Sequence, residues 1–94
     1  MRLTPEEQAT LKQTLSSLSN EAKLYLFGSR TDDTKRGGDI DLLVISDRLS
    51  KSDLRQLRVK FFERFGEQKI DIVLDDGTLK DPFVKLIFNK AIPL

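Results

Sequence analysis

The chain has 94 residues, of which 16 are basic and 15 acidic, so its formal charge is +1. This length suits a single domain (1–94) with a modest core, and the near-neutral balance gives no argument for a nucleic acid or an anionic membrane as partner. Because the chain contains no cysteine and no histidine, disulfides, thiolate and zinc sites and histidine catalysis are excluded. Only carboxylates, hydroxyls, lysine and arginine remain for chemistry.

The sequence also bears on location. The N-terminal segment MRLTPEEQAT lacks the apolar core of a signal peptide. No run approaches the roughly 18 apolar residues that a membrane span needs. We therefore expect a cytoplasmic protein.

The first half of the chain predicts a helix, a strand, a loop and a second strand. Thr4 and Pro5 carry the signals of a capped helix start, and leucines at helical spacing continue that helix to Leu18. The segment KLYLF (23–27) is rich in β-forming residues and predicts a short strand. The polar, glycine-ended segment RTDDTKRGG predicts an exposed loop. The almost continuous apolar run over 39–46 is typical of a strand covered on both faces.

The second half predicts a helix, a strand and a last helix. Ser50 and Ser52 offer caps for a helix that runs to about Phe65. The segment KIDIVL (69–74) predicts the third strand, and the Asp-Asp-Gly sequence after it predicts a turn. An Asp-Pro dipeptide then starts a helix that Pro93 stops. The apolar residues expected on one face of this helix are Phe83, Leu86, Ile87 and Ala91.

These elements predict an α/β (α+β) fold, in which helices pack on a small mixed sheet. The strand, helix and strand between residues 39 and 74 predict a right-handed crossover that joins parallel strands. The loop between the first two strands is too short for a crossover helix. We therefore expect that pair to be antiparallel.

Acidic residues occur in two of the predicted strands. Because side chains alternate across a strand, Asp39 and Asp41 should project to one face, roughly 7 Å apart. Asp71 lies inside the apolar run of the next strand, where a buried, unpaired carboxylate would cost several kcal/mol. If the strands are neighbours, the three carboxylates can share one site, and such hard oxygen ligands suit Mg²⁺ or Mn²⁺. The hypothesis is a two-metal site for phosphoryl or nucleotidyl transfer.

A simpler interpretation of these acids stays open. Asp39 can be a strand-entry residue, Asp41 an edge charge and Asp71 the partner of a lysine. The D-x-D pair alone does not decide between the two interpretations. The third acid favours the metal site, because it gives the buried carboxylate a function.

Gly28, Ser29 and Arg30 follow the first predicted strand. Gly28 would let a ligand approach the backbone, Ser29 offers a hydroxyl, and Arg30 offers a charged fork for phosphate. By itself, the tripeptide is better explained as a turn glycine followed by a solvated arginine. The segment GSRTDDTKRGGD lacks the lysine and hydroxyl at the spacing of a P-loop.

Together these motifs resemble a known signature. Gly28-Ser29-Arg30, GDIDL at 38–42 and KIDIV at 69–73 resemble the pattern of the nucleotidyltransferase superfamily related to DNA polymerase beta. More narrowly, they are similar to the minimal nucleotidyltransferase (MNT) proteins of bacteria and archaea. That pattern is a Gly-Ser pair, a D-x-D pair on the next strand and a third acid on a following strand. The chain departs from it at Gly38, where members often have serine.

The resemblance implies a polymerase beta palm-like fold and a metal-dependent nucleotidyltransferase. It implies that Asp39 and Asp41 bind two ions, Mg²⁺ or Mn²⁺, and that Asp71 acts as metal ligand and base. The substrate would be a nucleoside triphosphate, in the first place ATP, whose α-phosphate an acceptor hydroxyl attacks. The nucleotide-binding residues would be Gly28, Ser29 and Arg30, whereas Lys35 and Arg36 are better explained as residues of a solvated loop.

The resemblance also implies a partner. Minimal members are often encoded beside a helical HEPN protein and act as the antitoxin of a toxin–antitoxin pair, in some cases by adding AMP to a tyrosine of the toxin. Two classes therefore compete: an enzyme that transfers AMP to a HEPN toxin, and a catalytically idle antitoxin that neutralises its partner by forming a complex. The short chain fits a protein acceptor. Exposed apolar residues near the end of the sequence could contribute to the interface: Phe83, Phe88, Ile92 and Leu94. Packing of the last helix on the sheet explains Phe83 equally well.

Overall fold

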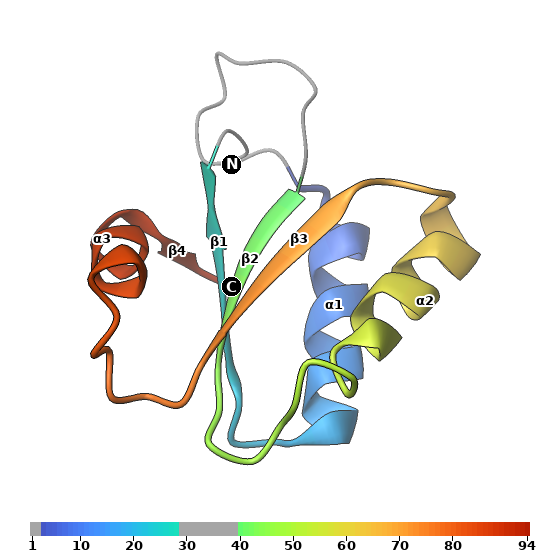
Figure 1. Ribbon diagram of the computed structural model, residues 1–94. Coiled ribbons are helices and arrows are strands. Elements are labelled where there is room, and N and C mark those ends of the chain that lie inside the picture. The colour runs from blue at the N-terminus through green and yellow to red at the C-terminus, as the bar shows by residue number, and fades with distance from the viewer. Residues whose placement is uncertain (1–2, 29–39) are drawn as a thin grey trace.

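The structure is a computed structural model that describes residues 3–28 and 40–94. This part of the chain forms three helices and four strands (Figure 1). In chain order they are α1 (Pro5–Leu18), β1 (Lys23–Phe27), β2 (Ile40–Ile45), α2 (Arg55–Phe65), β3 (Ile70–Asp75), α3 (Pro82–Lys90) and β4 (Ile92–Pro93). None of these helices is long and apolar enough to cross a lipid bilayer.

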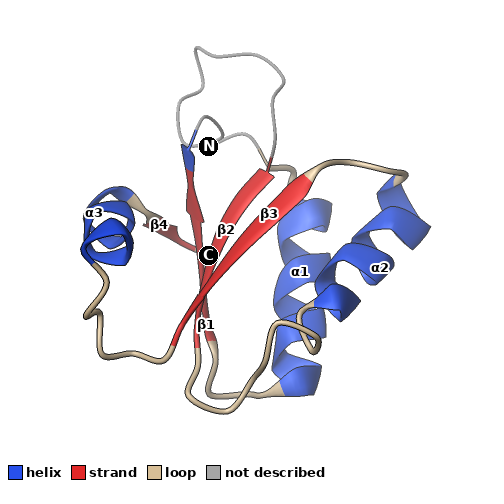
Figure 2. Ribbon diagram, in the orientation of Figure 1, coloured by secondary structure: helices blue, strands red, loops and turns tan. Residues whose placement is uncertain are grey.

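The strands form one mixed sheet in the order β3-β2-β1-β4. Strand β1 is antiparallel to both β2 and β4, whereas β2 and β3 are parallel and joined through α2. The two predicted pairings, antiparallel before the loop and parallel across the crossover helix, are confirmed. Helices α1 and α2 cover one face of the sheet and α3 covers the other (Figure 2).

The core is divided by the sheet into two layers. The larger layer packs side chains of β1, β2 and β3 against α1 and α2, with Leu42 and Val44 at its centre. The smaller layer packs Leu43, of the same strand, against Val84 and Ile87 of α3. Strand β2 is therefore covered on both faces, as its apolar run predicts.

The helix starts follow the sequence signals in α1 and α3 but not in α2. Thr4 and Glu7 form a reciprocal capping box before α1, and Asp81 accepts a hydrogen bond from the Phe83 N–H before α3. The prediction that Ser50 or Ser52 caps the second helix is wrong. Ser50 instead caps the turn just before α2. Its Oγ accepts a hydrogen bond from the Asp53 N–H at 3.4 Å, and the Asp53 carboxylate accepts one from the Ser50 N–H. Helix α2 itself begins at Arg55, with Leu54 in the N-cap position and no side-chain cap.

The C-terminal segment differs from the prediction in two ways. The face of α3 that packs on the sheet carries Val84 and Ile87, while Phe83 and Leu86 are 57% and 60% exposed. The prediction that Phe83 and Leu86 lie on the packed face is wrong. This short helix has two sets of apolar residues at helical spacing, and the sequence alone does not show which set packs against Leu43. The short strand β4 is also unpredicted. Pro93 cannot donate to a ladder, yet an edge strand tolerates it, and the next N–H, of Leu94, donates to the Leu24 carbonyl at 3.0 Å.

The predicted turn after β3 is confirmed, and it contains one titration that can be measured. The Thr78 hydroxyl and N–H both donate to the Asp76 carboxylate, at 2.7 Å and 3.0 Å, and these hydrogen bonds lower the pKa of Asp76 below its ordinary value. The turn is therefore stabilised while Asp76 is ionised, and this contribution is lost as the pH falls through the lowered pKa. We expect Thr78→Val to raise the pKa of Asp76 in an NMR titration. An unchanged pKa would contradict the assignment.

Candidate functional site

Three of the predicted site residues lie at one end of the sheet. Gly28 directly follows β1, Asp41 is the second residue of β2, and Asp71 is the second residue of β3. The register pairs Phe27 with Asp41 across the antiparallel ladder and Asp41 with Asp71 across the parallel one. Three strands thus bring together residues that the sequence separates.

Asp41 and Asp71 are direct neighbours. Residues that face each other in a parallel ladder lie on strands about 4.8 Å apart and project to the same face of the sheet. That face is the one under α3, because Leu43, two residues after Asp41, packs against this helix. The pairing of two acids at this position would be repulsive without a cation between or beside them.

The surroundings of these two carboxylates correct part of the sequence argument. Strand β3 is at the edge of the sheet and Asp71 is exposed, so its charge carries no cost of burial, and the expectation of a buried carboxylate is wrong. Asp41 lies on an interior strand and is half-buried, so it is not an edge charge. Within residues 3–28 and 40–94, no lysine forms an ion pair with Asp71. The simpler interpretation therefore loses two premises, that Asp41 is an edge charge and that Asp71 pairs with a lysine. The metal-site hypothesis loses its argument from the burial of Asp71 and depends instead on the pairing of the two acids.

Gly28 is required by the position of Asp41. It has a φ of 79°, in the left-handed region that favours glycine. A Cβ built on Gly28 would clash with the Asp41 Oδ2 atom. The sequence predicted a glycine that lets a ligand approach, but it did not show that this glycine also makes room for the neighbouring carboxylate.

The other predicted site residues lie outside the described part of the chain. They include one of the three predicted metal ligands, Asp39, and the departure from the family pattern, Gly38. The remaining ones are Ser29, Arg30, Lys35 and Arg36.

The described donors fit a hard divalent cation. Asp41 and Asp71 offer carboxylate oxygens on one face, the donor type that Mg²⁺ and Mn²⁺ prefer. Among the described residues no group of three acidic side chains could hold a metal ion. The third predicted ligand, Asp39, is outside that set, so the described pair represents two of the three predicted donors.

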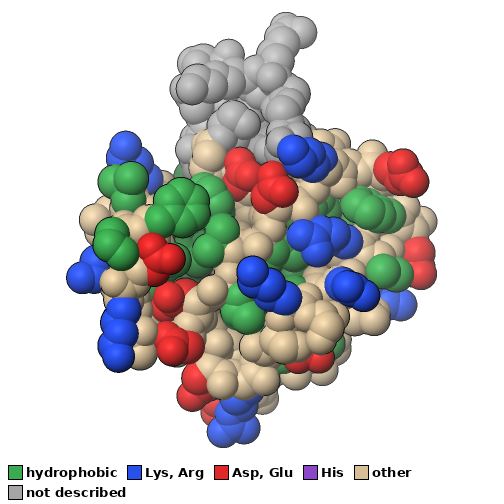
Figure 3. Space-filling model, viewed as in Figure 1, with side chains coloured by type: hydrophobic (Ala, Val, Ile, Leu, Met, Phe, Trp, Pro, Cys, Tyr) green, Lys and Arg blue, Asp and Glu red, His purple; other side chains and the backbone are tan. Residues whose placement is uncertain are grey.

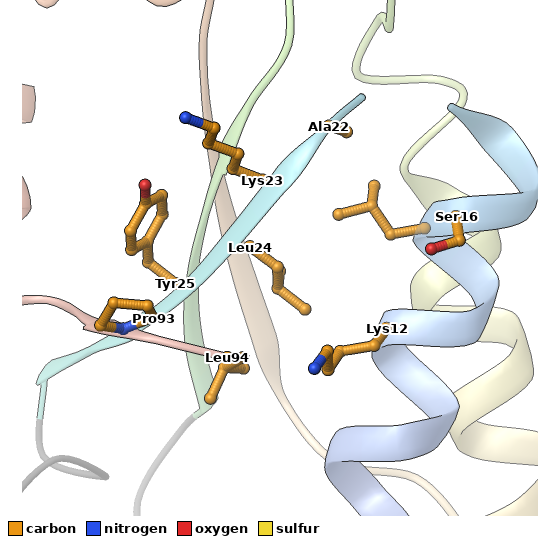
Figure 4. Close-up of a pocket in the computed structure, with 9 residues that line it drawn as sticks. Lys12, Ser16, Ala22, Lys23, Leu24, Tyr25, Pro93 and Leu94 are labelled. Atoms are coloured by element: carbon orange, nitrogen blue, oxygen red, sulfur yellow. The ribbon is translucent and has the colours of Figure 1, made fainter. Parts of the chain in front are cut away.

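One hollow with a partly apolar lining lies away from these acids. Its volume is about 360 Å³, and it is formed between α1 and the junction of β1 with β4. Figure 4 shows Lys12 and Ser16 of α1 facing this hollow, with Leu24 and Leu94 on the sheet side. It lies by the beginning of β1, whereas Gly28 follows the end of that strand, and no Asp or Glu side chain is among its described lining residues. It is therefore not the place where the predicted acids act.

The fold and the paired acids define an α/β domain of the polymerase beta-like kind. The sequence profile of the nucleotidyltransferase domain matches residues 9–93, nearly the whole chain. This protein belongs to the nucleotidyltransferase domain family, and its general activity is nucleotidyl transfer. A search of curated proteins finds no match. Nucleotidyltransferases use a nucleoside triphosphate and typically a divalent metal ion.

Proposed function

We propose that this protein transfers AMP from ATP to a hydroxyl group of a partner protein, with Mg²⁺ or Mn²⁺. The observation that carries the proposal is the side-by-side placement of Asp41 and Asp71, with Gly28 packed against Asp41. Each of the three residues matches one part of the family pattern, although they come from three different strands. Packing of the hydrophobic core does not explain why these residues lie together, because Asp71 is exposed and Asp41 is half-buried.

The roles of the residues follow from the reaction. The acceptor oxygen forms a bond to the α-phosphorus, the bond to the bridging oxygen breaks, and pyrophosphate leaves with the bonding electrons. Asp71, the exposed acid, takes the proton of the acceptor hydroxyl. Asp41, together with Asp39, would hold the metal ions, which neutralise the charge that develops on the phosphate oxygens when they are bound. Gly28 would let the triphosphate approach the backbone, and the contacts predicted for Ser29 and Arg30 lie outside the described residues.

A protein acceptor is supported by exposed apolar side chains on the surface of α3. Phe83 and Leu86 are both exposed on α3, the helix that covers the same face of the sheet as Asp41. Two other residues predicted for the interface, Phe88 and Leu94, are instead partly buried against the core. Large apolar side chains at neighbouring positions are typical of a contact surface. We propose that the acceptor is a helical HEPN-type toxin that this protein neutralises as an antitoxin.

Label transfer tests this function. The protein and the helical partner that co-purifies with it are incubated with Mg²⁺ and ATP labelled at the α-phosphate, in parallel with the Asp41→Asn variant. We expect label on the partner with the wild-type protein and none with the variant. A stable complex without label would assign the protein to the idle antitoxins that act by occlusion.

A further inference from the structure

The outer edge of β3 is open in the described part of the chain. Strand β3 pairs with β2 on one side and occupies the end of the sheet order on the other. The Lys69 and Asp75 carbonyls accept hydrogen bonds from the β2 side, from the N–H groups of Ile40 and Ser46. Because backbone groups alternate along a strand, the N–H and carbonyl groups of Ile72 and Leu74 point to the open edge. This edge can accept another strand.

One end of this edge is already closed. The Arg58 side chain, from α2, donates through Nε to the Ile70 carbonyl at 2.9 Å. An added strand would compete with this bond at Ile70 but not at Ile72 or Leu74. The part of the edge that is open to an added strand therefore ends beside Asp71, which lies between the bonded Ile70 carbonyl and the open Ile72 carbonyl.

A strand added there would deliver a side chain to Asp71. In an antiparallel ladder through the Ile72 backbone groups, the residue opposite Asp71 occupies a non-hydrogen-bonded pair, with Cα atoms about 4.5 Å apart and side chains on the same face. That face also carries Asp41. A hydroxyl side chain at this position is within reach of the acid that would remove its proton.

The charge beside the edge selects the kind of segment. Lys51 and Arg58 line a small groove with Ile72, between the start of α2 and β3. Figure 3 shows Lys and Arg side chains gathered over this part of the molecule. Neither residue forms an ion pair among the described residues. Side chains of an added strand that alternate with the hydroxyl residue would point to this basic side of the sheet.

We propose that the acceptor is presented as an extended acidic segment of the partner protein, which pairs with β3 at Ile72 and Leu74 and places a hydroxyl residue beside Asp71. This inference rests on the proposed function for the role of Asp71. Strand addition of this kind uses main-chain hydrogen bonds for affinity and alternate side chains for specificity. The basic side recognises the acidic residues, and Asp71 receives the hydroxyl.

Amide hydrogen exchange in the full-length protein tests this arrangement without nucleotide. The probe is the peptide acetyl-Glu-Thr-Glu-Tyr-Gly-amide, at millimolar concentration, in which tyrosine faces Asp71 and the glutamates face the basic side. We expect slower exchange at Ile72 and Leu74, and no protection by the same peptide N-methylated at the glutamate before tyrosine. Lys51→Glu should weaken binding by about two- to fivefold, whereas Lys60→Glu, elsewhere on α2, should not.

Several results would overturn the inference. Exchange at Ile72 and Leu74 that the peptide leaves unchanged is one. Another is protection that already rises with protein concentration, which would assign the edge to a second copy of the chain. Binding of oligouridylate at Lys51 and Arg58, without peptide binding, would assign the basic groove to RNA. The exchange experiment contains no nucleotide, so it tests the strand addition independently of the transfer activity. A peptide that gives no protection does not contradict label transfer, and absence of label transfer does not contradict the protection.

Discussion

Asp71→Asn is expected to lower the rate of nucleotidyl transfer by roughly 10²–10⁴-fold, the range that a positioned general base contributes. Asparagine has almost the same shape as aspartate, but it cannot take the proton of the acceptor hydroxyl. Because Asp71 is exposed on an edge strand, the free energy of unfolding should change by less than about 0.5 kcal/mol. The loss would therefore be one of chemistry and not of folding.

The measurement is pyrophosphate release with the co-purified partner, together with urea unfolding of the same samples. Asp47→Asn is the matched control, because Asp47 is also an exposed aspartate, and it lies near the opposite end of β2, after that strand. It should leave both the rate and the stability unchanged. Equal, measurable rates for wild type and Asp71→Asn would remove Asp71 from the chemistry. No release above background with either protein, although the complex forms, would favour the idle antitoxin.

Local signals predicted most of the fold. Helix α1 has the predicted bounds because a capping box and a proline mark its start and leucines at helical spacing continue it. The parallel and antiparallel pairings followed from the lengths of the connections. The start of α2 was missed for a local reason, the turn that Ser50 and Asp53 form before it. The other failures depend on contacts distant in sequence. Strand β4 exists because β1 offers it an edge, and the packed face of α3 is chosen by Leu43, a residue of β2.

The candidate site shows the same division. The proximity of Asp41 and Asp71 could be predicted, because two acids near the starts of neighbouring parallel strands meet at one end of a sheet. The exposure of Asp71 could not be predicted, because an apolar run predicts a buried strand and does not show whether that strand is interior or at an edge of the sheet. The contact of Gly28 with Asp41 required the register of the antiparallel pair, which no sequence feature fixes.

Gly28→Ala should damage both stability and transfer, and Gly66 offers a matched comparison. Both glycines have a positive φ, 79° and 87°, so an alanine at either position is strained, at a cost of about 1–3 kcal/mol. A Cβ on Gly66 meets no atom within 4 Å, whereas one on Gly28 clashes with the Asp41 carboxylate. At Gly66, where ψ is 174°, an alanine is strained without any steric contact. The transfer rates of the two variants therefore show what the contact with Asp41 contributes.

We expect Gly66→Ala to lower the free energy of unfolding by that strain alone and to keep its transfer rate. Gly28→Ala should lose more stability and at least about tenfold in rate, because a displacement of the order of 1 Å in a catalytic group can cost about 10²-fold. Urea unfolding and pyrophosphate release, measured on both variants, give the comparison. If Gly28→Ala loses stability but keeps the rate, then the position of Asp41 is not what the reaction requires, and the role of holding the metal ions would pass to Asp39 and Asp71. If both variants lose rate equally, the effect lies in the backbone and not in the contact between Gly28 and Asp41.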